Sequence, residues 1–215
     1  MTTLPDAADL AAERTGDDPV LDAALSAFLD FGIRRTTMSE IARRARISPA
    51  TLYRRYAQKS DVVMGVGLRE AGRVLHRLDE VVDLTAAPLE QLTAIHLTVV
   101  AELRGNELLR RVLATEPETV LPKLSVDADP VLDIGRGYLS AFLTRLQDEG
   151  HLPRYDVTPV ADSLARLVQS EVLTPSRAPL SDEEARAFVR DHLAPFIRLG
   201  PSEGKSDDHA SRQAR

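Results

Sequence analysis

The chain of 215 residues lacks cysteine and tryptophan, and only 4% of its residues are aromatic. The absence of cysteine excludes disulfide scaffolds, thiolate metal sites and cysteine nucleophiles, and it suits a reducing cytoplasm. No apolar run approaches the roughly 18–20 residues that a membrane span needs, which excludes an integral membrane protein. We therefore expect a cytoplasmic protein that has no membrane partner.

Sequence signatures of catalysis are missing as well. The five histidines show no metal-ligand spacing, and glycine-rich phosphate loops, G-x-S-x-G and H-E-x-x-H are absent. The acidic run Asp182-Glu183-Glu184 fits the negative charge favoured at a helix start. The sequence therefore predicts no catalytic residue, no metal site and no cofactor.

Strand signals are weak along the whole chain, whereas helix-start signals recur. Thr37–Glu40 and Ser181–Glu184 have the pattern of capping boxes. Ser48, Asp129 and Thr158 each place a capping side chain before a proline. These signals predict an all-α protein of about nine helices.

The expected helices lie near 18–32, 38–44, 49–56, 60–84, 88–104, 106–115, 129–149, 159–173 and 182–198. The stretch 116–128 contains two prolines and is predicted to be a loop with a short turn. Pro195 is expected to kink or end the last helix. The polar ends, 1–16 and 200–215, are expected to be disordered tails.

Charge is distributed unevenly along the chain. The net charge is −6, yet the segment from Ile33 to Ser60 carries eight basic residues against one acidic residue, Glu40. This segment is therefore +7, and the other 187 residues sum to −13. Such a basic segment is typical of nucleic-acid binding, although an arginine-rich surface on a plain helical bundle would give the same count.

The spacing within this segment favours a helix-turn-helix. Two short helices, 38–44 and 49–56, are linked by the turn Ala45-Arg46-Ile47, and Ser48 precedes the second helix as its cap. The apolar side chains expected to point inward are those of Ile41, Ala45, Ile47, Leu52 and Tyr56. The outward face of the second helix would then present Ala50, Thr51, Tyr53, Arg54 and Arg55, which suits a surface that enters the major groove.

The segment resembles the DNA-binding domain of TetR-family transcriptional regulators. The resemblance covers Phe28, Gly32 and the run from Thr36 to Val63, and Thr51-Leu52-Tyr53, Tyr56 and Lys59 are its most specific parts. It implies an N-terminal helix-turn-helix domain, 17–64, and a larger helical domain for effector binding and dimerisation, 65–199.

By the family's pattern, Pro49, Ala50, Thr51 and Tyr53 approach bases, and Thr37, Arg55 and Lys59 approach phosphates. The full predicted DNA-binding set is Thr37, Arg46, Ser48, Pro49, Ala50, Thr51, Tyr53, Arg54, Arg55 and Lys59. The chain departs from the family at Arg46, where glycine is frequent in the turn. Either the turn has another geometry, or Arg46 reaches a phosphate.

The last two expected helices each carry an apolar stripe at helical spacing. Two such helices from each of two chains could form a four-helix dimer interface. The alternative is that both stripes pack only on their own core. The predicted interface residues are Leu164, Leu167, Val168, Phe188, Val189, His192 and Phe196.

A pocket between the helices near 88–104 and 129–149 is the expected effector site. The candidate lining residues are His96, Val100, Arg136, Tyr138 and Phe142. Two glycines, Gly135 and Gly137, interrupt the second of these helices, which could mark a close approach or an opening beside a cavity. Ordinary core packing is the alternative for each candidate.

These observations together predict a homodimeric repressor that binds a near-palindromic operator on double-stranded DNA. A small-molecule effector, expected to be an apolar or amphipathic metabolite or drug, would tilt the helix near 60–84 and release the DNA. One alternative is a regulator of the same fold that activates transcription or binds no ligand. The other is a helical adaptor that has lost DNA binding, although an adaptor has no need for the +7 segment.

Overall fold

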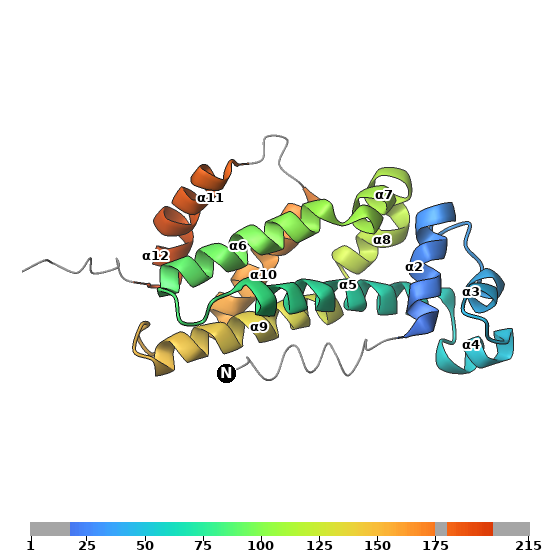
Figure 1. Ribbon diagram of the computed structural model, residues 1–215, viewed down its shortest axis with the longest axis horizontal. Helices are drawn as coiled ribbons and strands as arrows, with labels where there is room; N and C mark the ends of the chain where they lie inside the picture. Colours follow the sequence, from blue (N-terminus) through green and yellow to red (C-terminus); the bar gives the residue numbers. More distant parts are fainter. Residues whose placement is uncertain (1–17, 175–179, 200–215) are drawn as a thin grey trace, which may run out of the picture.

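The computed structural model describes residues 18–174 and 180–199, and within these ranges the regular structure is entirely helical (Figure 1). The all-α prediction is therefore confirmed, whereas the predicted tails, 1–16 and 200–215, lie outside the described residues. The elements are α2 (Pro19–Phe31), α3 (Met38–Arg44), α4 (Pro49–Arg55), α5 (Lys59–Val81), α6 (Pro88–Gly105), α7 (Glu107–Thr115), α8 (Pro117–Leu124), α9 (Asp129–Asp148), α10 (Thr158–Leu173), α11 (Asp182–Phe188), the π-helical turn η1 (Val189–Leu193) and α12 (Ala194–Phe196). None of the described helices is long and apolar enough to cross a membrane.

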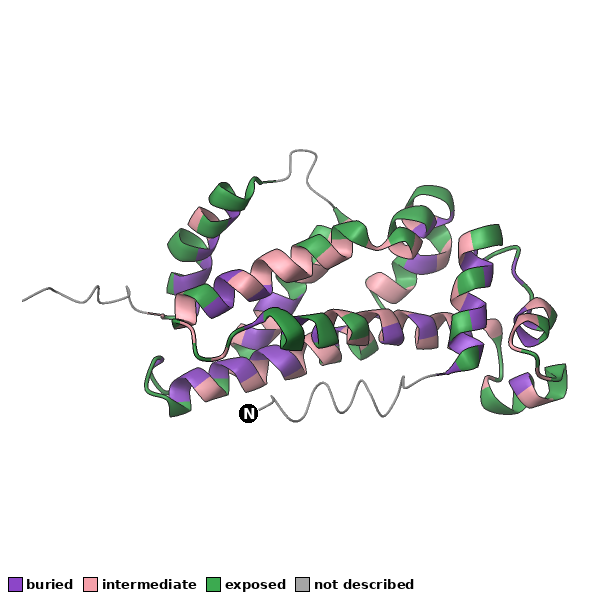
Figure 2. Cartoon of the chain, viewed as in Figure 1, coloured by how far each residue is buried: buried purple, intermediate pink, exposed green. Residues whose placement is uncertain are grey.

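Helices α2, α3 and α4 form one end of the elongated molecule, and α5 runs from this end along α6 and α9 (Figure 1). Buried residues follow the inner faces of these helices (Figure 2). They form two hydrophobic cores. The N-terminal core consists of Val20, Leu21, Ala24, Phe28, Ile33, Met38, Ile41, Ala42, Leu52, Val62, Val66, Val112 and Val120. The C-terminal core is built mainly by the second half of α5 with α6, α9, α10 and η1.

Several predicted capping side chains start helices as expected. The hydroxyl of Thr37 accepts the backbone N–H of Glu40 at 3.2 Å, and that of Ser48 accepts the N–H of Thr51 at 3.1 Å. Ser181 and Glu184 bond reciprocally as a complete capping box. Around Thr37 only half of a box forms, because the Glu40 carboxylate bonds arginines instead.

Two predicted caps are wrong by one residue. Asp129 and Thr158 are the first residues of α9 and α10, and neither helix has a side-chain capping bond at its N-terminus. The N-cap positions are taken by Ala128 and Val157. Proline is therefore the second residue of each helix, where its missing N–H has no intrahelical partner to lose.

The prediction of a loop at 116–128 is also wrong, because α8 occupies Pro117–Leu124. Proline is tolerated in the first turn of a helix, so Pro117 begins this helix instead of preventing it. Pro122 stands in the last turn, just before the helix ends. The interruption predicted at Pro195 is confirmed: the helix widens into the π-helical turn η1 and ends three residues after it, at Phe196.

The corner between α7 and α8 packs on the N-terminal core, not on the C-terminal one. Val112 and Val120 are buried in the same cluster as Phe28 and Ile41. These two helices follow α6 in the chain but supply part of the core on which α2, α3 and α4 rest. The boundary predicted near residue 64 therefore does not separate the two hydrophobic cores.

Candidate nucleic-acid interface

The turn between α3 and α4 holds Arg46 in the left-handed region, with φ of 57°. The chain reverses there through two backbone bonds, from the N–H of Arg46 to the carbonyl of Arg43 at 3.2 Å and from Ile47 to Ala42 at 3.0 Å. Of the two possibilities at Arg46, a different turn geometry is therefore wrong. The backbone of Arg46 therefore adopts a conformation that costs a non-glycine residue about 1–2 kcal/mol.

Helix α4 turns one side to the core and the other to solvent. The side chain of Leu52 is fully buried, whereas the next residue, Tyr53, is 52% exposed. Pro49, Ala50 and Arg54 are exposed on the same short helix. The Oγ atoms of Ser48 and Thr51 lie 2.9 Å apart at the beginning of the helix, so small hydroxyl groups occupy this end.

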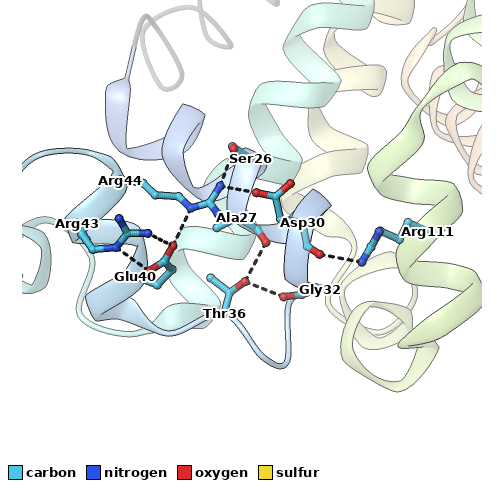
Figure 3. A network of polar contacts seen from close by, with 9 residues as sticks. All are labelled: Ser26, Ala27, Asp30, Gly32, Thr36, Glu40, Arg43, Arg44 and Arg111. Carbon is cyan, nitrogen blue, oxygen red and sulfur yellow. Dashed lines mark hydrogen bonds and ion pairs between the residues drawn. The ribbon is translucent and has the colours of Figure 1, made fainter.

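A network of arginines fixes α3 on α2 (Figure 3). The Arg44 guanidinium donates to Glu40 at 2.8 Å and to the Ser26 hydroxyl at 2.8 Å, and it pairs with Asp30 at 2.7 Å. Glu40 also accepts two bonds from Arg43. These hydrogen-bonded guanidinium groups lower the pKa of Glu40 to about 2, so its carboxylate stays ionised and neutralises part of the basic segment.

Asp18 connects α4 with the beginning of α2. Its carboxylate accepts the Tyr56 hydroxyl at 2.6 Å and pairs with Arg55 at 3.0 Å, and it also caps α2 through the N–H of Val20. Burial and the hydrogen bond to Asp18 raise the pKa of Tyr56 to about 12. Arg55, predicted to approach a phosphate, therefore has a carboxylate partner within its own subunit.

The ammonium group of Lys59 faces the protein. It donates to the backbone carbonyls of Ile33, Arg34 and Thr36 at 2.9, 3.1 and 3.0 Å. An ammonium has three protons, so these bonds use its whole donor capacity. Lys59 thus holds the loop between α2 and α3 against the start of α5. In this arrangement its ammonium group has no N–H left to donate to the predicted phosphate.

The number of free cations is smaller than the +7 of the sequence suggests. Acidic residues from outside the segment, Asp18, Asp30 and Glu118, pair with three of its arginines. Among the residues that the structure describes, Arg35, Arg46 and Arg54 have no ion pair. These three exposed arginines are the basic side chains left available around the turn and α4.

A family model described as bacterial regulatory proteins, tetR family, matches residues 20–64, which contain α2 from its second residue on, α3, α4 and the start of α5. Uncharacterised HTH-type transcriptional regulators of Mycobacterium bovis and Mycobacterium tuberculosis are 30% identical over 154 residues, 71% of this chain and 78% of each relative. The chain belongs to the TetR family of bacterial regulatory proteins. It is accordingly a DNA-binding transcriptional regulator of the helix-turn-helix type.

Solved structures show the same fold beyond the matched segment of this TetR-family regulator. The TetR family repressor AlkX from Dietzia sp. superimposes with a TM-score of 0.65 at 19% identity, covering 83% of this chain and 93% of AlkX. The fatty acid degradation regulator FadR from Bacillus halodurans gives 0.55 at 19% identity, covering 85% and 96%. The similarity extends through the helices that follow α5.

The predicted effector residues of this TetR-family chain do not line one common pocket. Tyr138 lines a cavity of about 150 Å³ between α5, α9 and α10, whereas His96 and Val100 line another of about 100 Å³ between α6, α10 and α11. Arg136 and Phe142 line neither of them. Gly135 lines the first cavity, and a Cβ added there would meet Ala165 Cβ at an ordinary 3.8 Å, so no close approach of the helices requires this glycine.

Local packing explains the two residues outside these cavities. Arg136 pairs with Asp129, Asp133 and Asp162 at 3.3, 2.8 and 2.6 Å, and these carboxylates raise its pKa. Phe142 is fully buried in the C-terminal core. Burial lowers the pKa of His96, which favours a neutral imidazole beside the Phe188 ring, 5.7 Å away.

The residues predicted for the dimer interface differ in how far they are exposed. Leu164 and Val189 are buried within their own subunit, so they belong to the core in the way that the alternative interpretation described. Val168 and Phe188 are partly buried and line cavities. Exposed on α10, η1 and α12 are Leu167, His192 and Phe196.

Sequence reasoning missed one polar residue that joins the corner between α7 and α8 to the loop between α2 and α3. Glu116, between α7 and α8, is only 6% exposed, and its carboxylate accepts the backbone N–H of Arg34 at 2.8 Å. Nearby, Arg111 donates to the Asp30 carbonyl at 3.3 Å (Figure 3). These partners are 82 and 81 residues apart in sequence, and no local pattern signals such a pairing.

Proposed function

We propose that the protein is a homodimeric repressor that binds a palindromic operator and leaves it when a small-molecule effector binds. The observation that carries the proposal is the exposed face of α4, where Ala50, Tyr53 and Arg54 project from a helix anchored by buried Leu52. A short helix held in this way can enter the major groove, where threonine and alanine contact thymine methyl groups and arginine pairs with guanine. Two such helices would lie about 34–36 Å apart, or a multiple of that distance.

Selection of bound DNA from a random library tests the proposal directly. We expect the wild-type protein to enrich a palindrome whose half-sites are separated by whole helical turns. Tyr53→Ala should change the selected bases or reduce the discrimination between sequences, because the proposal assigns the exposed Tyr53 side chain to base edges. Arg35→Ala is the matched control: this exposed residue lies outside α4, so its loss should leave the selected sequence unchanged. Identical selections by the wild type and Tyr53→Ala would contradict the placement of the base-contacting face.

The dimer part of the proposal rests on exposed apolar side chains in α10 and α12. Leu167 is 48% exposed and Phe196 is 47% exposed, and burial of such surface favours association. The combined substitution Leu167→Glu and Phe196→Glu should convert a dimer to a monomer, because association would bury two carboxylates without partners.

Sedimentation equilibrium measures this change. Val126→Glu is the control, because Val126 is 83% exposed in the segment between α8 and α9, away from the proposed interface. It should leave the dimer intact. A double variant that remains dimeric would place the interface elsewhere, and a monomeric wild-type protein would contradict the homodimer.

The effector part of the proposal rests on the internal cavities. The cavity of about 150 Å³ next to Tyr138 and a second of about 180 Å³ next to Phe28 both border α5, the helix that follows the DNA-binding helices directly. A ligand in these cavities can move α5 only if it binds the released conformation more tightly than the DNA-bound one. The cavity near His96 is smaller, about 100 Å³, and lies away from α5.

A further inference from the structure

Two cavities along α5 share part of their lining, and we name them the first and the second lobe. The first lobe, of about 150 Å³, lies between α5, α9 and α10, and the second, of about 180 Å³, lies between α5, α7 and α8. Both are lined by Ala71 and Val74 of α5 and by Leu103 of α6. A molecule that fills both lobes would therefore pass directly along α5.

The lobes lie in different hydrophobic cores. Leu132, Tyr138 and Leu139 of the C-terminal core line the first lobe. Phe28 and Ile33 of the N-terminal core line the second, together with Val112 and Val120 of α7 and α8. The second lobe thus reaches the residues that support the DNA-binding helices, whereas the first lobe contacts none of α2, α3 or α4.

The lining of both lobes is mainly aliphatic. Each lobe contains a single aromatic side chain, Tyr138 in the first and Phe28 in the second. Two neighbouring cavities with mainly aliphatic walls fit a flexible chain better than a flat ring system, because a chain can adapt to both cavities by bond rotation.

The charged side chains at the walls already have partners. Glu70 accepts bonds from Arg73 at 2.5 Å and from the Asn106 amide at 3.0 Å, and Lys123 donates to Asp127 at 2.9 Å. Glu102 lies 4.0 Å from the guanidinium of Arg77. The walls therefore leave no unpaired charge to compensate an ionised ligand, and burying such a ligand would be unfavourable.

We propose that the effector is an uncharged, flexible aliphatic molecule long enough to fill both lobes, and that only the part in the second lobe causes release from DNA. This inference rests on the effector-release part of the proposed function. A chain confined to the first lobe contacts α5, α6, α8, α9 and α10 but none of α2, α3 or α4. A longer chain also pushes against Phe28, Ile33 and the helices α7 and α8. Between these two helices, the Glu116 carboxylate accepts the N–H of Arg34 in the loop before α3, so their movement is transmitted to that loop.

A homologous series of n-alkanols, from butanol to decanol, tests the proposal with the full-length protein. Calorimetry without DNA should show an affinity that rises about three- to fourfold per methylene group as the chain grows. Release of the operator obtained by selection, followed by fluorescence anisotropy, should have a length threshold: short chains bind without releasing DNA, and long chains do both. n-Decanoate and n-decylamine at pH 7 should bind at least tenfold more weakly than n-decanol.

Substitutions at two glycines distinguish the contributions of the two lobes. Gly67 lines the second lobe, and a Cβ added there meets nothing within 4 Å, so Gly67→Leu should fill this lobe and abolish the extra affinity of long alkanols while short ones bind as before. Gly67→Ala, a smaller change in the same helix, should reduce that extra affinity only in part. Gly135→Leu, which fills the first lobe, should weaken binding of the whole series.

The outcomes distinguish this inference from the proposed function. Affinity independent of chain length, tighter binding of decanoate or decylamine, or release by the shortest binding alkanol would each overturn the inference. If the protein selects an operator but no alkanol binds, the inference fails while DNA recognition stands. If no DNA sequence is selected although alkanols bind with the expected length dependence, the proposed function fails and the ligand class stands.

Discussion

Gly32→Ala is expected to lower the free energy of unfolding by about 3–5 kcal/mol, because it combines backbone strain with a lost buried hydrogen bond. Gly32 has φ of 82° and ψ of 162°, a region that is populated almost only by glycine. An added Cβ would overlap the Oε1 atom of Glu116, so this carboxylate would have to move away from the N–H of Arg34. Equilibrium unfolding in urea at pH 7 measures the change.

Gly150→Ala is the matched control for this substitution. Gly150 has a similar φ of 80°, but a Cβ added there meets nothing within 4 Å. Its replacement should therefore lower the free energy of unfolding only by the cost of a positive φ for alanine, about 1 kcal/mol. Equal losses for the two variants would show that contact with Glu116 does not contribute at Gly32.

Lys59→Ala is expected to lower the unfolding free energy by about 2–4 kcal/mol, because three backbone carbonyls lose a charged hydrogen-bond donor. The salt dependence of DNA binding should change little, since the ammonium group faces Ile33, Arg34 and Thr36 and not a phosphate. Urea unfolding and operator binding at several salt concentrations measure the two effects separately.

Arg54→Ala should show the opposite behaviour. Arg54 is exposed and has no ion pair among the described residues, so its removal should change stability by less than about 0.5 kcal/mol. If Arg54 contacts a phosphate, Arg54→Ala removes that contact. The magnitude of the slope of log K against log salt then falls by about one unit. If Lys59→Ala is as stable as the wild type and lowers the salt slope, its ammonium reaches a phosphate, as the sequence had indicated.

Local patterns in the sequence predicted the helix-turn-helix well. The short helices α3 and α4 start where Thr37 and Ser48 cap them, and Leu52 is buried as its spacing indicates. These features depend on neighbours within a few residues, so periodicity and capping rules capture them. The positive φ at Arg46 is also local, since only a tight turn can connect helices this close.

Features that depend on distant partners were beyond such rules. The +7 charge of the basic segment includes Arg44 and Arg55, but Asp30 and Asp18, which lie outside the segment, pair with them across the fold. Arg136 is adjacent to cavity-lining Gly135, yet it points to carboxylates of α9 and α10. Whether such a side chain points to solvent, into a cavity or to a carboxylate depends on how the helices pack. A single sequence does not specify that packing.

The burial of Val112 and Val120 in the N-terminal core affects how this regulator can be divided. A fragment ending near residue 64 would leave part of the surface around Phe28 without its cover from α7 and α8, and such a fragment would be prone to aggregation. Chimaeras that exchange DNA-binding specificity between relatives would consequently need to transplant 107–124 together with the first 64 residues, or to match the two surfaces by redesign.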